Sequence, residues 1–210
     1  MIDHKHKFIF IHIPKTGGTS IEKLFIPTAD IQNVNLKHDT LRTILGTRPK
    51  IKNYFKFTVV RNPWDLTASL YYYMWKSQYE WPQRWRKMIS AQIPGVLDMS
   101  LNDWVNHESF AYSGPRSRSL FNKNPTERLQ LDWISNNTGS PEMDYIIKFE
   151  NLQNDFDNVC NKLGLPFQNL PHINKTDREP YGELYTTETR EIVARKFKKD
   201  IDFFQYEFGE

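Results

Sequence analysis

An apolar run near the amino terminus, Phe8-Ile9-Phe10-Ile11-His12-Ile13, leads directly into the turn Pro14-Lys15-Thr16-Gly17-Gly18-Thr19-Ser20. This order predicts a buried strand over residues 8–13, a glycine-rich loop, and a helix over residues 19–25. Glycines allow backbone N–H groups to converge on an oxyanion, and the positive end of the helix dipole favours the same ligand. The loop therefore predicts a phosphate-binding site.

The place of the lysine in this loop indicates which phosphate chemistry to expect. In the loop of nucleoside triphosphatases, the lysine follows the last glycine and the next hydroxyl holds a magnesium ion. Here Lys15 precedes both glycines, and Gly18 is followed by Thr19. This order disfavours a small-molecule kinase of the P-loop type, which stays open as an alternative. A non-catalytic module that binds nucleotides or glycans is the other alternative.

A second strand-to-helix junction follows further along the chain. Residues 55–60 are mostly apolar and predict a buried strand, and Arg61-Asn62-Pro63 comes directly after them. Asn62 is a typical helix cap and Pro63 a typical first helical residue. Ser69 then lies about two turns into that helix, on the same face as its start. Arg61 and Ser69 therefore predict a second anion site, and two such sites suit adenosine 3′,5′-bisphosphate.

At these residues the chain resembles the superfamily of sulfotransferases that use 3′-phosphoadenosine 5′-phosphosulfate (PAPS). Residues 14–20 resemble the 5′-phosphosulfate loop, and residues 61–65 with Ser69 resemble the 3′-phosphate motif. Residues 149–152, 172–176 and 200–206 are similar to later landmarks of the branch that contains heparan and chondroitin sulfotransferases. The resemblance implies PAPS as the donor substrate, without a metal, and a hydroxyl group of a carbohydrate as the acceptor.

The loops and the resemblance together define an expected site. We expect Lys15 to stabilise the negative charge that develops on the leaving oxygen of the donor during in-line displacement. The residues expected to bind PAPS are Lys15, Thr16, Gly17, Gly18, Thr19, Ser20, Arg61, Ser69 and Lys175. No spacing of His, Cys, Asp and Glu predicts a metal site.

A histidine is expected to accept the proton of the acceptor hydroxyl. His38 precedes a helix expected over residues 39–45, where the positive dipole end favours a neutral, proton-accepting imidazole. His172 is the alternative base, although its segment is expected to close over the nucleotide. His12, inside the first strand, is expected to be a packed core histidine.

Alternating strands and helices predict an α/β fold for residues 1–210, a single domain with a P-loop-like, three-layer arrangement. A central parallel sheet is expected to be flanked by helices. Further elements are expected as a strand over residues 145–149 and helices over residues 63–79, 152–163 and 187–204. Residues 80–124 contain no clear strand and are expected to recognise the acceptor.

Composition limits the partners and the location. A formal charge of +3 is modest, so binding to nucleic acid is not expected. The lone Cys160 excludes a disulfide within the chain and is expected in a helix core. The first residues contain no apolar signal segment, and no apolar run is long enough to span a membrane. A cytoplasmic location is therefore expected, and the sequence does not indicate an oligomeric state.

Overall fold

The computed structural model describes residues 1–25, 38–75, 87, 95, 98–107, 129–171 and 178–209. The chain divides into two compact units, and each is described by itself. Unit 1 comprises Met1–Arg61 and Lys123–Lys175, and unit 2 comprises Asn62–Asn122 and Thr176–Glu210. The expectation of a single domain stays a prediction.

Unit 1 is built on a four-stranded sheet with the strand order β1-β2-β3-β4. The strands are β1 (Ile2–Asp3), β2 (Phe8–Ile11), β3 (Phe55–Val60) and β4 (Tyr145–Lys148). Strands β2, β3 and β4 are parallel, whereas β1 pairs with β2 in the antiparallel direction. The expectation of a wholly parallel sheet is therefore wrong at β1. The reason is the short turn before Phe8, which includes Lys7 at a φ of 55° and can join only antiparallel neighbours.

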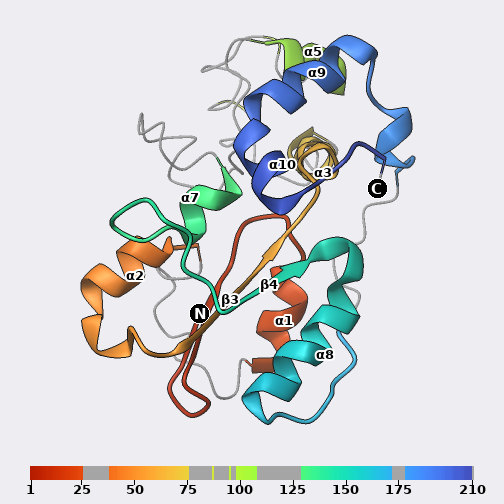
Figure 1. Cartoon of the computed structure of the whole chain (residues 1–210). Coiled ribbons are helices and arrows are strands. Elements are labelled where there is room, and N and C mark those ends of the chain that lie inside the picture. The colour runs from red at the N-terminus through yellow and green to blue at the C-terminus, as the bar shows by residue number, and fades with distance from the viewer. Residues whose placement is uncertain are drawn as a thin grey trace. The chain divides into compact units, whose positions relative to one another are not determined.

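Helices lie on both faces of this sheet. Helix α1 (Gly18–Phe25) and helix α8 (Leu152–Leu163) pack on one face, and α2 (Leu41–Thr47) and α7 (Gln130–Ile134) lie on the other (Figure 1). The core under α1 and α8 consists of buried residues from both helices and from the strands: Met1, Phe8, Phe10, Ile21, Phe25, Phe57, Val59, Ile147, Phe156, Val159 and Cys160. Unit 1 is thus an α/β layered structure, and Cys160 has the expected core position.

Two elements of unit 1 have the bounds that the sequence predicts, namely β3 and α8. The strand expected over residues 8–13 ends at Ile11, and Phe149–Asn151 form a short 3-10 helix after β4. Helix α2 begins two residues later than expected because Thr40 is its cap, with Oγ1 accepting the N–H of Thr43 at 3.3 Å. A second 3-10 helix, Pro49–Ile51, follows α2.

Unit 2 is helical in its described part. It contains α3 (Pro63–Trp75), α5 (Leu101–Asn106), the 3-10 helix Tyr181–Glu183, α9 (Thr187–Lys196) and α10 (Lys198–Phe204). Helix α9 packs against both α3 and α5.

The start of α3 follows the sequence prediction, since the side chain of Asn62 accepts the N–H of Trp64 at 3.2 Å. The single helix expected over residues 187–204 is wrong, because Phe197 has a non-helical φ of −108° and ψ of 19° that separates α9 from α10. Both helices place apolar residues on the buried side, so periodicity alone does not reveal the break.

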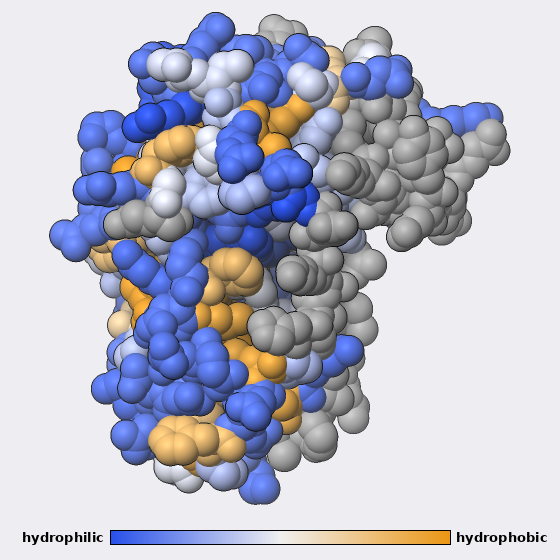
Figure 2. Space-filling view, turned by 90° about the vertical axis from the view of Figure 1, so that its right-hand side faces the viewer, coloured by the Kyte–Doolittle hydropathy of each residue, from blue (hydrophilic) through white to orange (hydrophobic). Residues whose placement is uncertain are grey.

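Most apolar side chains of the described residues are used in packing. On the face seen in Figure 2, hydrophilic residues cover most of the coloured surface, with hydrophobic patches between them. The large hydrophobic side chains that are exposed in the described ranges are those of Phe167 and Phe203. Within those same ranges, no helix has the length and apolar character needed to cross a membrane.

Candidate active site

The loop between β2 and α1 has a backbone that can surround an anion. Lys15 and Gly17 both adopt left-handed conformations, with φ of 67° and 86°, on either side of Thr16. Alternation of left-handed and other conformations makes successive N–H groups point into one concavity, which is a common anion site in proteins. The loop ends where Gly18 begins α1, so the positive end of the helix dipole lies at the same place.

Both glycines of the loop are required by close neighbours in unit 1. A Cβ atom at Gly17 would lie 2.9 Å from the ring of Phe149, and one at Gly18 would lie 2.5 Å from Cδ2 of His12. Neither position has room for a side chain. The Gly-Gly pair therefore allows the loop to lie against the rings of Phe149, His12 and Phe10, in addition to its conformational freedom.

Two hydroxyl groups of the loop hold the loop itself in place. Thr16 Oγ1 donates to the carbonyl of Ile13 at 2.9 Å, and Ser20 Oγ donates to the carbonyl of Pro171 at 2.7 Å. The sequence predicts that these hydroxyls donate to a phosphate, and this stays a prediction. Thr19 is half-buried at the second position of α1, and its predicted contact with the donor is likewise untested.

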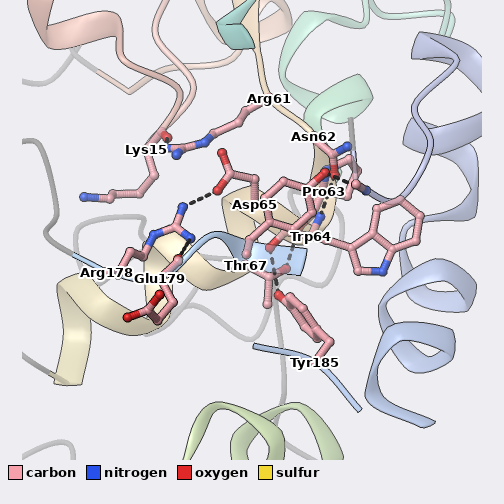
Figure 3. A network of polar contacts seen from close by, with 12 residues as sticks. Lys15, Arg61, Asn62, Pro63, Trp64, Asp65, Thr67, Arg178, Glu179 and Tyr185 are labelled. Carbon is pink, nitrogen blue, oxygen red and sulfur yellow. Dashed lines mark hydrogen bonds and ion pairs between the residues drawn. The ribbon is translucent and has the colours of Figure 1, made fainter. Parts of the chain in front are cut away.

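Arg61, which follows β3, reaches the loop. Its Nη1 donates to the carbonyl oxygen of Lys15 at 2.9 Å (Figure 3), and its guanidinium lies 3.9 Å above the centre of the Phe149 ring. The backbone of Arg61 is held by Gln130, whose Oε1 accepts the N–H at 2.9 Å and whose Nε2 donates to the carbonyl at 2.8 Å. The structure thus brings together two residues that the sequence places in separate anion sites.

This arrangement makes the loop electropositive. Burial, followed by the nearby charge of Arg61, lowers the pKa of Lys15 from 10.5 to about 8. A lowered lysine pKa means that the ammonium form is disfavoured where it lies. A bound anion would relieve both causes, because it would replace lost hydration and offset the repulsion from Arg61. The site is therefore suited to a negatively charged ligand.

His38 lies just before α2, as expected, and its ring orientation is defined by a backbone group. Its Nδ1 is 3.1 Å from the carbonyl oxygen of His12. A carbonyl only accepts, so Nδ1 must carry the proton of this hydrogen bond. In a neutral ring, Nε2 is then the nitrogen that can accept a proton.

His12 contacts His38 directly and is paired with a carboxylate. The ring centroids of His12 and His38 are 4.7 Å apart, and His12 Nδ1 lies 2.7 Å from Oε1 of Glu22 on α1. His12 and Glu22 are both buried, at 4% and 6% exposure. The expectation of a packed His12 is confirmed, but the sequence does not reveal its partners.

Comparison with known proteins identifies the family of the chain. The chain matches the Sulfotransferase family over residues 1–207. It is a member of that family. The chain is also 24% identical to carbohydrate sulfotransferase 14 of Danio rerio, in an alignment that covers 96% of this chain and 58% of that protein. It thus spans little more than half the length of this relative. No solved structure matches the chain significantly.

The remaining expected site residues of this sulfotransferase family member are described only in part. Ser69 is a buried residue of α3 in unit 2. Lys175 and His172 lie outside the described residues, as does most of the segment 80–124. Within the described ranges, no group of three or more His, Cys, Asp and Glu side chains is placed to hold a metal ion.

Within unit 2, a buried polar network lies at the start of α3. Arg178 forms an ion pair with Asp65, and the hydroxyl of Tyr185 donates to the carbonyl of Trp64 at 2.7 Å (Figure 3). Burial and the charge of Asp65 raise the pKa of Tyr185, so this hydroxyl stays protonated at neutral pH. The network ties the chain after residue 177 to α3, the helix that contains most of the predicted 3′-phosphate motif.

Sequence reasoning missed two residues that shape the site in unit 1. Gln130 clamps the backbone of Arg61, and Glu22 pairs with His12. Phe149 belongs to a segment that the sequence does single out, but its contacts with Arg61 and Gly17 are not predicted. Gln130 carries no local signal, since its partner is far away in the sequence. Glu22 carries a weak one, because a carboxylate on the buried side of an amphipathic helix requires a partner.

Proposed function

We propose that the protein transfers the sulfuryl group of PAPS to a hydroxyl group of a carbohydrate. Membership of the Sulfotransferase family supports sulfuryl transfer, and the name of the relative from Danio rerio supports a carbohydrate acceptor. The observation that carries the proposal is the hydrogen bond from the Arg61 guanidinium to the carbonyl of Lys15, which brings both residues to one glycine loop. Two cationic residues at the same loop support binding of a doubly phosphorylated donor.

In this proposal the donor is bound through backbone and cationic groups. The N–H groups of residues 16–20 and the start of α1 surround the 5′-phosphosulfate, and Arg61 binds the 3′-phosphate. Ser69 and Lys175 are proposed to complete the donor site, as the resemblance implies. The P-loop-like character of the fold belongs to the same proposal.

The chemistry is an in-line displacement at sulfur. The acceptor oxygen forms a bond to sulfur while the bond between sulfur and the bridging oxygen of PAPS breaks, and that electron pair leaves on the 5′-phosphate. The Lys15 ammonium stabilises the developing charge on this oxygen. His38 Nε2 receives the proton of the acceptor hydroxyl, with Nδ1 fixed by the carbonyl of His12. His172 remains the alternative base.

The acceptor-recognition segment is proposed to lie within residues 80–124, as the sequence predicts. The cytoplasmic location also stays a prediction.

Transfer of radiolabelled sulfate from PAPS to a panel of glycans tests the proposal. Wild-type protein should label at least one glycan, and Lys15→Ala should lower kcat by about 10²- to 10³-fold, as expected for one transition-state donor. Lys50→Ala is the matched control, since Lys50 is an exposed lysine of unit 1 and should retain full activity. Transfer of radiolabelled phosphate from ATP in the presence of magnesium, without transfer of sulfate from PAPS, would instead support the kinase alternative.

A further inference from the structure

Two buried ionisable side chains next to His38 in unit 1 have no role in the proposed chemistry so far. Glu22 on α1, His12 after β2 and His38 before α2 form a continuous chain of contacts. The carboxylate and the first imidazole are buried, and the second imidazole lies against the first. Such a chain needs a reason, because burying a carboxylate is costly unless it is paired.

We propose that Glu22 and His12 are positioning residues that orient His38 and favour its protonation during catalysis. This inference rests on the proposed function, in which His38 is the base. The first part concerns orientation. Glu22 holds the ring of His12 through its Nδ1. The backbone carbonyl of His12 in turn accepts the Nδ1–H of His38. A shift of His12 would therefore move the acceptor of the hydrogen bond that selects the His38 tautomer.

The second part concerns charge. When His38 receives a proton it becomes an imidazolium, and a carboxylate one imidazole ring away stabilises that charge. In this proposal His12 is the neutral ring between the carboxylate and His38. It is buried beside the ring of Phe10 and lies against Gly18 at the positive end of the α1 dipole, and both features oppose a positive charge on that ring. The charge of Glu22 then acts on His38.

Other charged groups lie near this cluster, and any test must distinguish their titration from that of His38. Burial lowers the pKa of the Met1 amino group to about 6, and the charges of Glu22, Asp39 and Arg48 also act on it. Met1 nitrogen donates to the carbonyl of Phe10 at 2.7 Å. Because this amino group titrates in the same range as a histidine, a pH–rate profile alone cannot identify His38.

Nuclear magnetic resonance of the histidine Cε1–H groups provides the direct measurement. The His38 and His12 signals are assigned with the variants His38→Asn and His12→Asn. We expect Glu22→Gln to lower the pKa of His38 by about 0.5 to 1.5 pH units, because it removes the Coulomb attraction of a carboxylate that lies one imidazole ring away. The acidic limb of the rate profile should move the same way, with binding of adenosine 3′,5′-bisphosphate within about twofold of wild type.

Glu142→Gln is the matched control. Glu142 is also a glutamate of unit 1 with an amide donor, Asn136, and a nearby lysine, Lys56. Removing its charge should leave the titration of His38 and the rate unchanged. An equal shift in both variants would show a general effect of net charge and would overturn the specific role of Glu22.

A second measurement needs no substitution. Long-range proton–nitrogen correlation in the wild-type protein reports the tautomer of each ring, and we expect hydrogen on Nδ1 in both His12 and His38. A neutral ring with its hydrogen on Nε2 and none on Nδ1, in either His12 or His38, would refute the positioning chain. If the tautomers and the Glu22→Gln shift are as expected but His38→Ala keeps wild-type turnover, the base assignment fails while the coupling of Glu22 to His38 stands.

Discussion

Replacing Gly17 by alanine tests whether the loop depends on its contact with Phe149. Gly17 has a φ of 86°, which an alanine adopts only at a cost of about 1 kcal/mol. The new Cβ would also lie 2.9 Å from two atoms of the Phe149 ring and 3.3 Å from Leu152 Cδ2. Phe149 cannot simply move away, because the guanidinium of Arg61 lies 3.9 Å above its ring.

The two penalties should add. Overpacking at a rigid site costs about 1–3 kcal/mol, so Gly17→Ala should lower the free energy of unfolding by roughly 2–4 kcal/mol. It should also weaken binding of adenosine 3′,5′-bisphosphate, because displacement of Phe149 displaces Arg61. Adding Phe149→Leu should restore part of the stability, because it relieves the steric contact but not the cost of the positive φ.

Urea unfolding of unit 1, followed by a probe on that unit, measures the effect. Gly46→Ala is the control, since a Cβ at Gly46 in α2 would meet no atom within 4 Å. That substitution should stabilise by up to about 1 kcal/mol, as expected for glycine within a helix. If Gly17→Ala unfolds at the same urea concentration as Gly46→Ala, the close contact with Phe149 is not present in solution.

Three further predictions concern single side chains. The pKa of Lys15 is lowered to about 8, so its ammonium form destabilises the ligand-free protein. Lys15→Met should therefore raise the free energy of unfolding by on the order of 1–3 kcal/mol below pH 8, and this gain should disappear as the pH rises towards 10.5. A gain that does not change with pH would contradict the lowered pKa. Gln130→Leu leaves the N–H and carbonyl of Arg61 without their partner and should cost about 2–4 kcal/mol in urea unfolding, whereas an unchanged midpoint would refute the clamp. Asp65→Ala leaves the Arg178 charge buried and should lower the free energy of unfolding by about 3 kcal/mol. Asp202→Ala, in the exposed pair with Lys198, should lower it by about 0.5 kcal/mol or less. Equal losses would contradict the burial of the Asp65–Arg178 pair.

The sequence predicts the strand and helix junctions well because their signals are local. The apolar run of β3 and the Asn62-Pro63 start of α3 each depend on neighbouring residues, and both appear where expected. The loop is predictable for the same reason, since glycine and lysine spacing is read within a few residues. The antiparallel β1 is not, because its pairing depends on a two-residue strand without a periodic pattern.

The partners within the site could not be predicted, because they join distant parts of the chain. The contact of Arg61 with Lys15 spans 46 residues, and that with Gln130 spans 69. Sequence placed Lys15 and Arg61 in two anion sites but gave no reason to expect a hydrogen bond between them. The neighbours of His12 could not be predicted either. A histidine between apolar residues is typical of a core, and only the fold reveals that Glu22 and His38 lie beside it.

Lys15 and Arg61 are proposed to form one site for a nucleotide with both 5′- and 3′-phosphates. Calorimetric titration with adenosine 3′,5′-bisphosphate and with 5′-AMP tests it most directly. Wild-type protein should bind the bisphosphate about 10- to 100-fold more tightly, from a charge-assisted contact worth roughly 1.5–3 kcal/mol, and Arg61→Ala should lose most of that preference. Equal affinity of the wild-type protein for the two nucleotides would contradict the claim.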